Sequence, residues 1–284
     1  MDRFSGFNPK ATLLYFLLVI VGTLLLFNPI YLGISLVFAF LYRIKLTGYK
    51  SALRTLGIIP VLIALTSVFN MIFADYGMTV LFTLGNNSFK LESLAYGFTQ
   101  GLLVSGVLLW FSCYNEIVTG EMLLSVFGGF MPGTAMLFSM TLAFIPRLMR
   151  NAREINDARE QFEKGRSKLT HSVKNLSALV TLTLEESIER SDSMRARGYN
   201  SRRRPYSKYR FSHRDLLLVI SELMLFAFVL FVRLSRGAVF AFDPKIYVAE
   251  QSPLYIIIFT VFTALPLIID FTEDLKWKLL RRKL

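Results

Sequence analysis

Apolar residues gather along this chain into runs separated by shorter polar segments. A helix that crosses a lipid bilayer needs about 20 mostly apolar residues. Apolar runs occupy six segments, of which the second is short: residues 11–27, 30–42, 56–74, 94–114, 215–232 and 253–269. The pattern predicts six membrane-spanning helices. Asn28 and Pro29 separate the first two, because proline lacks the N–H group that a continuing helix needs. The first run has no Ala-x-Ala cleavage pattern, which indicates a retained span rather than a signal peptide.

The longest polar stretch, between the fourth and fifth runs, has the spacing of an amphipathic helix. Its apolar residues recur at steps of three and four, which places them in one stripe along a helix. They are Leu169, Val173, Leu176, Val180, Leu184 and Ile188. Residues 127–148, which precede the stripe, are apolar but contain three glycines as well as Pro132 and Pro146. These interruptions favour broken helices at the membrane surface over a straight seventh span.

The composition agrees with a chain embedded in lipid. Hydrophobic residues make up 54% of the chain and charged residues only 18%, against about 45–50% and 25% in soluble domains. The net charge is nevertheless +12, and from Arg147 to Arg214 there are seventeen Lys and Arg residues against eight Asp and Glu. Because cytoplasmic loops carry the positive excess, this region is predicted to be cytoplasmic. The excess of Lys and Arg in the other loops alternates between the two sides of the membrane in agreement with this assignment. Both termini are then predicted to lie in the cytoplasm.

The sequence thus predicts an all-α integral membrane protein with about six transmembrane helices and long cytoplasmic amphipathic helices. Three regions follow from the pattern. Residues 1–114 contain four spans, residues 115–214 contain the cytoplasmic helices, and residues 215–284 contain two spans and a basic tail.

Motifs for catalysis are absent from the sequence. No Gly-Lys pair occurs, so the chain has no P-loop for ATP phosphates, and neither H-E-x-x-H nor G-x-S-x-G is found. One cysteine, Cys113, and two histidines, His171 and His213, do not form a typical zinc site. Cys113 is predicted to be a buried thiol. The spans hold few ionisable groups, which argues against a self-contained ion pump. We therefore expect a protein that is not an enzyme and that binds no metal or cofactor itself.

The most distinctive short segment lies at the end of the amphipathic helix, from Ser193 to Tyr199. Gly198 is predicted to stop this helix, because glycine tolerates the left-handed conformation. Arg197 then projects a planar fork of donors that suits a carboxylate on a partner protein. A hydrogen bond to a charged group contributes about 1.5–3 kcal/mol. The alternative is that the basic residues here only complement the helix dipole.

Ala196, Arg197 and Gly198 follow an acidic run at residues 185–190 and precede Tyr199. In this setting they resemble the second Ala-Arg-Gly motif of the T component of energy-coupling factor transporters (the EcfT/CbiQ family). Further similar segments occur in the family's order between residues 8 and 234. They are Asn28-Pro29, Thr119-Gly120-Glu121, Phe144-Ile145-Pro146 and Glu154-Ile155-Asn156-Asp157-Ala158.

The family's first Ala-Arg-Gly motif has no intact counterpart in this chain. It aligns with Gln161, Phe162 and Glu163, none of which matches, and the shifted Glu163-Lys164-Gly165 has lysine in place of arginine. Lysine offers a point charge and not a planar fork. The first contact with an ATPase is therefore expected to be weaker, to use Arg159 or Lys164, or to suit a different ATPase subunit.

The resemblance implies a transport subunit in a prokaryotic cell membrane without catalysis of its own. Two cytoplasmic ABC-type ATPases, which bind ATP and Mg²⁺, would dock on the ends of two coupling helices. A separate membrane protein, the S component, would bind a vitamin or a transition-metal ion. The apolar stripe would then contact the S component or the neighbouring coupling helix. Packing against this chain's own membrane helices is the alternative.

The residues alone leave two other functions open. Glu185, Glu189 and Asp192 share one helix face near Glu186, as an interfacial acidic site of a membrane-embedded enzyme would require. A stand-alone carrier would need neither partner nor ATP.

A basic run follows the amphipathic helix: Arg202, Arg203, Arg204, Lys208, Arg210 and Arg214. Basic residues beside a membrane span are worth about 1 kcal/mol each near anionic lipid. We therefore expect this run to contact the lipid bilayer, and we expect no nucleic acid as a partner.

Overall fold

The computed structural model describes residues 6–74, 77–84, 87–162, 168–199, 211–235, 240–241, 247–248 and 252–281. Two compact units divide the chain. Residues 1–120 together with 209–284 form one, named here the membrane unit, and residues 121–208 form the other, named here the middle unit. The sequence pattern had placed the corresponding boundaries at 114 and 214.

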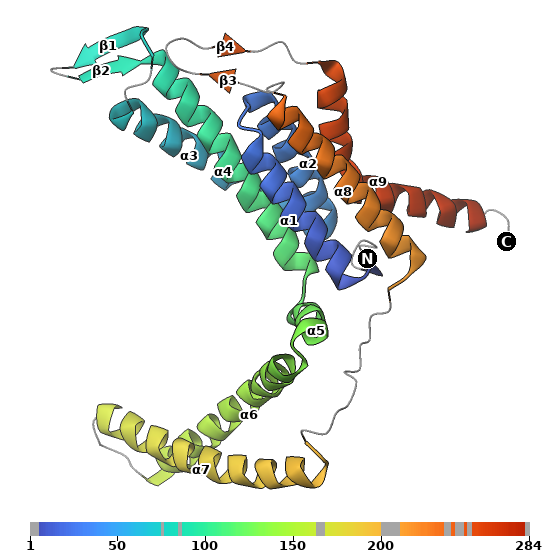
Figure 1. Ribbon diagram of the computed structural model, residues 1–284. Helices are drawn as coiled ribbons and strands as arrows, with labels where there is room; N and C mark the ends of the chain where they lie inside the picture. Colours follow the sequence, from blue (N-terminus) through green and yellow to red (C-terminus); the bar gives the residue numbers. More distant parts are fainter. Residues whose placement is uncertain are drawn as a thin grey trace. The chain divides into compact units, whose positions relative to one another are not determined.

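The described part of the membrane unit contains these helices: α1 (Pro9–Leu25), α2 (Pro29–Thr47), α3 (Tyr49–Phe73), α4 (Leu91–Ile117), α8 (His213–Leu234) and α9 (Pro253–Arg281) (Figure 1). Five of them, α2, α3, α4, α8 and most of α9, are long and apolar enough to cross a membrane. The remaining one, α1, is apolar but has 17 residues. That length corresponds to about 25 Å of helix, against roughly 30 Å of hydrocarbon. The chain is therefore a largely α-helical, multi-pass membrane protein.

The second and third helices are longer than the apolar pattern predicted. α2 continues to Thr47 and α3 begins at Tyr49, so that Gly48 alone connects them. Arg43 and Lys45, which follow the apolar run at residues 30–42, extend α2 instead. The expectation of a short second span was wrong because arginine and lysine are good helix formers and their long side chains reach past the apolar zone.

Two short β-hairpins, which the apolar pattern did not predict, lie at the same end of the membrane unit (Figure 1). β1 (Val80–Leu84) pairs antiparallel with β2 (Asn87–Lys90) in the connection from α3 to α4. β3 (Phe240–Ala241) pairs antiparallel with β4 (Tyr247–Val248) in the connection from α8 to α9. The fold is thus mainly but not wholly α-helical.

Buried polar contacts hold the first hairpin against the start of α4. Glu92, which is 2% exposed, accepts hydrogen bonds from the Thr79 N–H at 3.2 Å and from the Thr79 hydroxyl at 2.5 Å. The Ser93 hydroxyl donates to the Ala74 carbonyl at 2.6 Å. A carboxylate in the first turn of a helix is also favoured by the helix dipole. Glu92 is therefore a buried acid whose charge is stabilised by donors.

Two glycines let α3 and α4 approach each other closely. A Cβ atom at Gly97 would lie 2.7 Å from the Cα atom of Ser67, and one at Gly101 would lie 2.8 Å from the Cα atom of Ile63. Small residues four positions apart are typical of close helix contacts in membranes. Beside them the Asn70 amide donates to the Gln100 side-chain oxygen at 2.9 Å. The two helices are thus joined by tight packing and by an interhelical hydrogen bond.

Nine residues of helix α1 are buried, and its Tyr15 is fully buried. The Tyr15 hydroxyl lies 3.2 Å from the Phe262 carbonyl oxygen and 3.3 Å from that of Thr263, both on α9. Pro266 lacks the N–H group that would otherwise bond to the Phe262 carbonyl, and Figure 1 shows that α9 changes direction along its length. Tyr15 therefore satisfies a carbonyl that the proline leaves without its helical donor.

A second buried acid fixes the start of α8 beside the start of α1. Asp215 accepts a hydrogen bond from the Asn8 N–H at 3.0 Å and another from the Ser212 N–H at 2.7 Å. The bond to Ser212 belongs to a capping arrangement at the N-terminus of α8. The Asp215 carboxylate thus caps the N-terminus of α8 and joins two segments that are far apart in the sequence.

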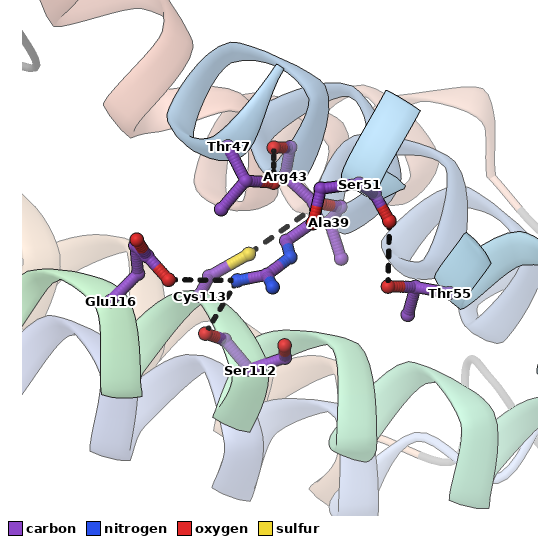
Figure 2. A network of polar contacts seen from close by, with 8 residues as sticks. All are labelled: Ala39, Arg43, Thr47, Ser51, Thr55, Ser112, Cys113 and Glu116. Atoms are coloured by element: carbon purple, nitrogen blue, oxygen red, sulfur yellow. Dashed lines mark hydrogen bonds and ion pairs between the residues drawn. The ribbon is translucent and has the colours of Figure 1, made fainter. Parts of the chain in front are cut away.

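Near the C-terminal end of α2, Arg43 joins this helix to α4 (Figure 2). The Arg43 guanidinium donates to the Ser112 carbonyl at 3.0 Å and lies 3.5 Å from the Glu116 carboxylate. The Cys113 thiol, fully buried as predicted, donates to the Ala39 carbonyl at 3.7 Å.

A second ion pair joins the last turn of α2 to α9. The Lys45 ammonium lies 3.2 Å from the Asp270 carboxylate, in an ion pair without hydrogen-bond geometry. The C-terminal ends of α2, α4 and the membrane part of α9 therefore lie together.

Candidate functional site

The middle unit contains the helices α5 (Gly120–Phe130), α6 (Pro132–Phe162) and α7 (Lys168–Ala196). The predicted break near the glycines is confirmed, because α5 ends one residue before Met131 and α6 begins at Pro132. Proline is favoured in the first turn of a helix, where its missing N–H group costs nothing. The predicted break at Pro146 was wrong, since α6 continues through it for 31 residues.

Helices α6 and α7 run antiparallel and are joined by Glu186. Its carboxylate lies 3.3 Å from the Arg147 guanidinium and accepts a hydrogen bond from the Asn151 amide at 3.2 Å. These contacts lie within two turns of Pro146. They hold α6 against α7 on the C-terminal side of the helical hydrogen bond that the proline removes.

Further polar contacts flank Glu186 along the same seam. The Arg190 guanidinium lies over the Phe144 ring, 5.1 Å from its centroid, which is within the range of cation–π attraction. Nearer the start of α7, the Asn175 amide donates to the Asn156 side-chain oxygen at 3.1 Å. The seam thus combines polar and charged contacts with half-buried apolar residues such as Leu148, Ile155 and Leu179.

The end of α7 is a Schellman motif. The Gly198 N–H donates to the Arg195 carbonyl and the Tyr199 N–H donates to the Met194 carbonyl, each at 3.0 Å. Gly198 has φ +75°, in the left-handed region that an L side chain rarely adopts. The prediction that Gly198 stops the helix is confirmed.

This helix end places the predicted coupling motif on the surface of the unit. Ala196 and Arg197 are exposed and Gly198 is half-buried. The Arg197 N–H still donates to the Ser193 carbonyl at 3.1 Å, so the backbone that carries the guanidinium is fixed by the last helical turn. An ordered, exposed arginine at a helix end suits recognition of a carboxylate.

The degenerate first motif falls at the other end of the α6–α7 pair. α6 ends at Phe162, within the segment that aligns with the family's first motif. Arg159, Gln161 and Phe162 belong to its last turns, although their side chains lie outside the described part of the structure. Glu163 and Lys164 lie outside the described residues altogether.

The apolar stripe of α7 is exposed. Val173, Leu176, Val180, Leu184 and Ile188 are 47–66% exposed, whereas Asn175, Glu186 and Arg190, on the opposite side of the helix, contact α6. Leu169 also belongs to α7, but its side chain lies outside the described part.

A second exposed stripe lies on α6 and was missed in the sequence. Phe138, Leu142, Ile145 and Met149 are 46–64% exposed and follow the steps of four, three and four that place residues on one helix face. The spacing was readable, but the nearby glycines and prolines had indicated broken helices. The middle unit therefore presents two apolar surfaces.

The acidic residues of α7 do not form a cluster. Glu185, Glu189 and Asp192 are exposed, while Glu186 binds Arg147 and Asn151. Within the described ranges, no three His, Cys, Asp or Glu side chains are placed to hold a metal ion.

His213 is exposed at the first residue of α8, and the side chain of His171 lies outside the described part.

One ionisable residue in a membrane span was missed in the sequence. Glu222 lies in α8 between Ser221 and Leu223 and is fully buried. The signal was present, because Glu222 is the one acid within the apolar run at residues 215–232 apart from its first residue.

No protein-family model matches the sequence, and no curated protein matches it.

Proposed function

We propose that this chain is the membrane-embedded coupling subunit, the T component, of an ATP-driven importer of the energy-coupling factor type in a prokaryotic cell membrane. In this role the chain catalyses no reaction. It transmits the closure of two ABC-type ATPases to an S component that carries a vitamin or a transition-metal ion.

The observation that carries the proposal is the end of α7. Ala196, Arg197 and Gly198, the residues that resemble the family's motif, coincide with a Schellman motif that holds Arg197 exposed at a helix end. A planar guanidinium in that position suits a carboxylate on an ATPase surface. The tripeptide therefore has the exposure and the fixed backbone that a docking element needs.

The antiparallel arrangement of α6 and α7 supports two separate ATPase contacts. Because the helices run in opposite directions, the C-terminal ends at Phe162 and Ala196 lie at opposite ends of the pair. The 29 residues of α7 correspond to about 43 Å of helix. One ATPase at each end is compatible with that length.

The exposed stripes on α6 and α7 support a further apolar partner. Exposed apolar surface of this extent marks an interaction site or contact with lipid. In the proposal, the S component covers the stripe formed by Val173, Leu176, Val180, Leu184 and Ile188.

The proposal includes six spans with both termini in the cytoplasm. α1 counts as the sixth span, because it lies buried beside α8 and because its Tyr15 donates a hydrogen bond to α9. The ends of α4 and α8 that connect to the middle unit lie away from the hairpins. Asn8, near the start of α1, contacts Asp215 at that same end, as an N-terminus on the cytoplasmic side requires.

Co-purification with ATPases tests the proposal. The chain would be produced with the pair of ABC-type ATPases encoded nearest to its gene, and ATPase retention and ATP hydrolysis would be measured in lipid nanodiscs. Arg197→Glu removes a charge-assisted hydrogen bond worth about 1.5–3 kcal/mol, which corresponds to about 10–150-fold in affinity. Arg197→Lys keeps the charge without the fork and should give a smaller loss.

Arg195→Glu is the matched control, because Arg195 is also exposed and lies in the same helical turn. It should retain the ATPases. Full retention of both ATPases and of ATP hydrolysis by Arg197→Glu would rule out the role given to Arg197.

A further inference from the structure

Glu222 lies on the buried stripe of α8. It shares that face with Asp215, Leu218, Val229 and Val232, and its side chain is 0% exposed. Neither carboxyl oxygen of Glu222 has a hydrogen-bond partner among the described residues. It differs in this respect from Glu92, which is equally enclosed but accepts bonds from Thr79.

No cation on the same helix compensates for Glu222. Asp215 is itself an acid and lies seven residues away, about 10 Å along the axis. Arg233 lies eleven residues away in the other direction, about 16 Å along the axis. His213 and Arg214 are exposed in the first turn of α8, beyond Asp215.

Helix α1, which packs against this face of α8, offers no cation close by either. Its titratable side chains are Lys10 and Tyr15. Lys10 is exposed in the first turn, beside the start of α8 rather than beside Glu222. The hydroxyl proton of Tyr15 is directed to the Phe262 and Thr263 carbonyls.

Helix α9, the other neighbour of α8, also leaves Glu222 without a cation among its described side chains. Asp270 is paired with Lys45 of α2. Tyr255 packs against Phe228, with ring centroids 5.8 Å apart. The described groups around Glu222 are therefore acidic, phenolic or apolar.

An ionised carboxylate without a partner is very costly inside a membrane span. We propose that Glu222 is a proton-binding site inside the membrane unit, and that α8 packs on α1 only while this carboxyl holds its proton. On release, the O–H bond breaks, its electron pair stays on the carboxylate, and the proton passes to water that enters the opened seam. The site thus makes the closed α1–α8 contact dependent on pH, independently of the coupling function proposed above.

Infrared spectroscopy of the full chain in nanodiscs tests for the bound proton directly. At neutral pH the wild type should show the C=O stretching band of a protonated carboxylic acid, shifted by ¹³C labelling of glutamate. Glu222→Gln should lack that band. Its absence from the wild type at neutral pH would overturn the proposal, whether or not the variant folds.

The pH dependence of unfolding provides a second measurement. An unfolded glutamate ionises near pH 4.3, whereas Glu222 in the folded chain keeps its proton. Folding then takes up a proton above that pH, so the unfolding equilibrium constant of the wild type should rise, relative to Glu222→Gln, by up to about tenfold per pH unit.

Glu116→Gln is the matched control, because the Glu116 side chain is 49% exposed beside Arg43. It should keep the pH dependence of the wild type. Identical pH profiles for the wild type and Glu222→Gln would overturn the proposal. Wild-type stability that followed the Na⁺ or K⁺ concentration instead of pH would also overturn it, because Glu222 would then hold a metal cation.

Discussion

Helices α7 and α8 both carry apolar residues at helical spacing, yet their stripes lie in opposite environments. On α8, Leu218, Val229 and Val232 are buried against other helices of the membrane unit. On α7, Leu184 and Ile188 are more than half exposed. The same sequence pattern thus produces an interior in one unit and an open surface in the other. The difference shows that the stripe of α8 is packed within the membrane unit, whereas the stripe of α7 stays exposed within the described part of the middle unit.

Matched truncations of one leucine in each helix test this comparison most strongly. Leu218→Ala should lower the free energy of unfolding by about 2–5 kcal/mol, because it leaves a cavity in a packed interior. Leu184→Ala, which removes the same atoms from an exposed site, should change it by no more than about 0.5 kcal/mol. Thermal or denaturant unfolding in one detergent measures both. Equal losses would show that the α7 stripe is packed within the chain.

Tightly packed and unpacked positions also occur within a single helix, α4. Gly97→Ala would bring a Cβ atom to 2.7 Å from the Ser67 Cα atom, and overpacking of this kind costs about 1–3 kcal/mol. Gly106→Ala meets no atom within 4 Å and should stabilise the helix by up to about 1 kcal/mol. Unfolding midpoints of the two variants should therefore move in opposite directions. Similar losses in both would contradict the close approach of α3 and α4.

A charge placed on the α7 stripe tests whether this exposed surface binds a partner. Ile188→Asp should leave the stability of the isolated chain nearly unchanged, because the side chain is exposed. It should weaken retention of an apolar membrane partner by about tenfold or more, which corresponds to about 1.4 kcal/mol. Co-purification from nanodiscs with the S component measures the loss. Ser193→Asp, at an exposed position on the opposite face of α7, is the control and should retain the partner.

The smallest effect is expected at the seam between α6 and α7. Arg147 is about half exposed where it pairs with Glu186, and such pairs contribute about 0.2–1 kcal/mol. Arg147→Ala should therefore lower stability by less than about 1 kcal/mol, and the loss should shrink at high salt. A loss as large as that of Leu218→Ala would mean that the seam is a true interior.

Features that depend on neighbouring residues could be predicted from the sequence, and features that depend on contacts between distant segments could not. Gly198 was predicted correctly as a helix stop because the left-handed conformation depends on one residue and its neighbours. Pro146 was misjudged because its effect depends on contacts between α6 and α7, which no local pattern reveals. The exposure of Leu184 and the burial of Leu218 could not be told apart, since both are leucines in amphipathic spacing. Glu222 was visible as an acid in an apolar run, but its lack of partners depends on how α1 and α9 pack around it.

The Schellman motif at the end of α7 has a consequence for recognition. Because the backbone N–H groups of Gly198 and Tyr199 are already bonded inside the chain, Arg197 is held by a rigid support before any partner arrives. A partner that binds it loses less conformational freedom than one that must first order a loose segment. The glycine therefore contributes to recognition indirectly, because the backbone conformation that it allows fixes the direction in which Arg197 is presented.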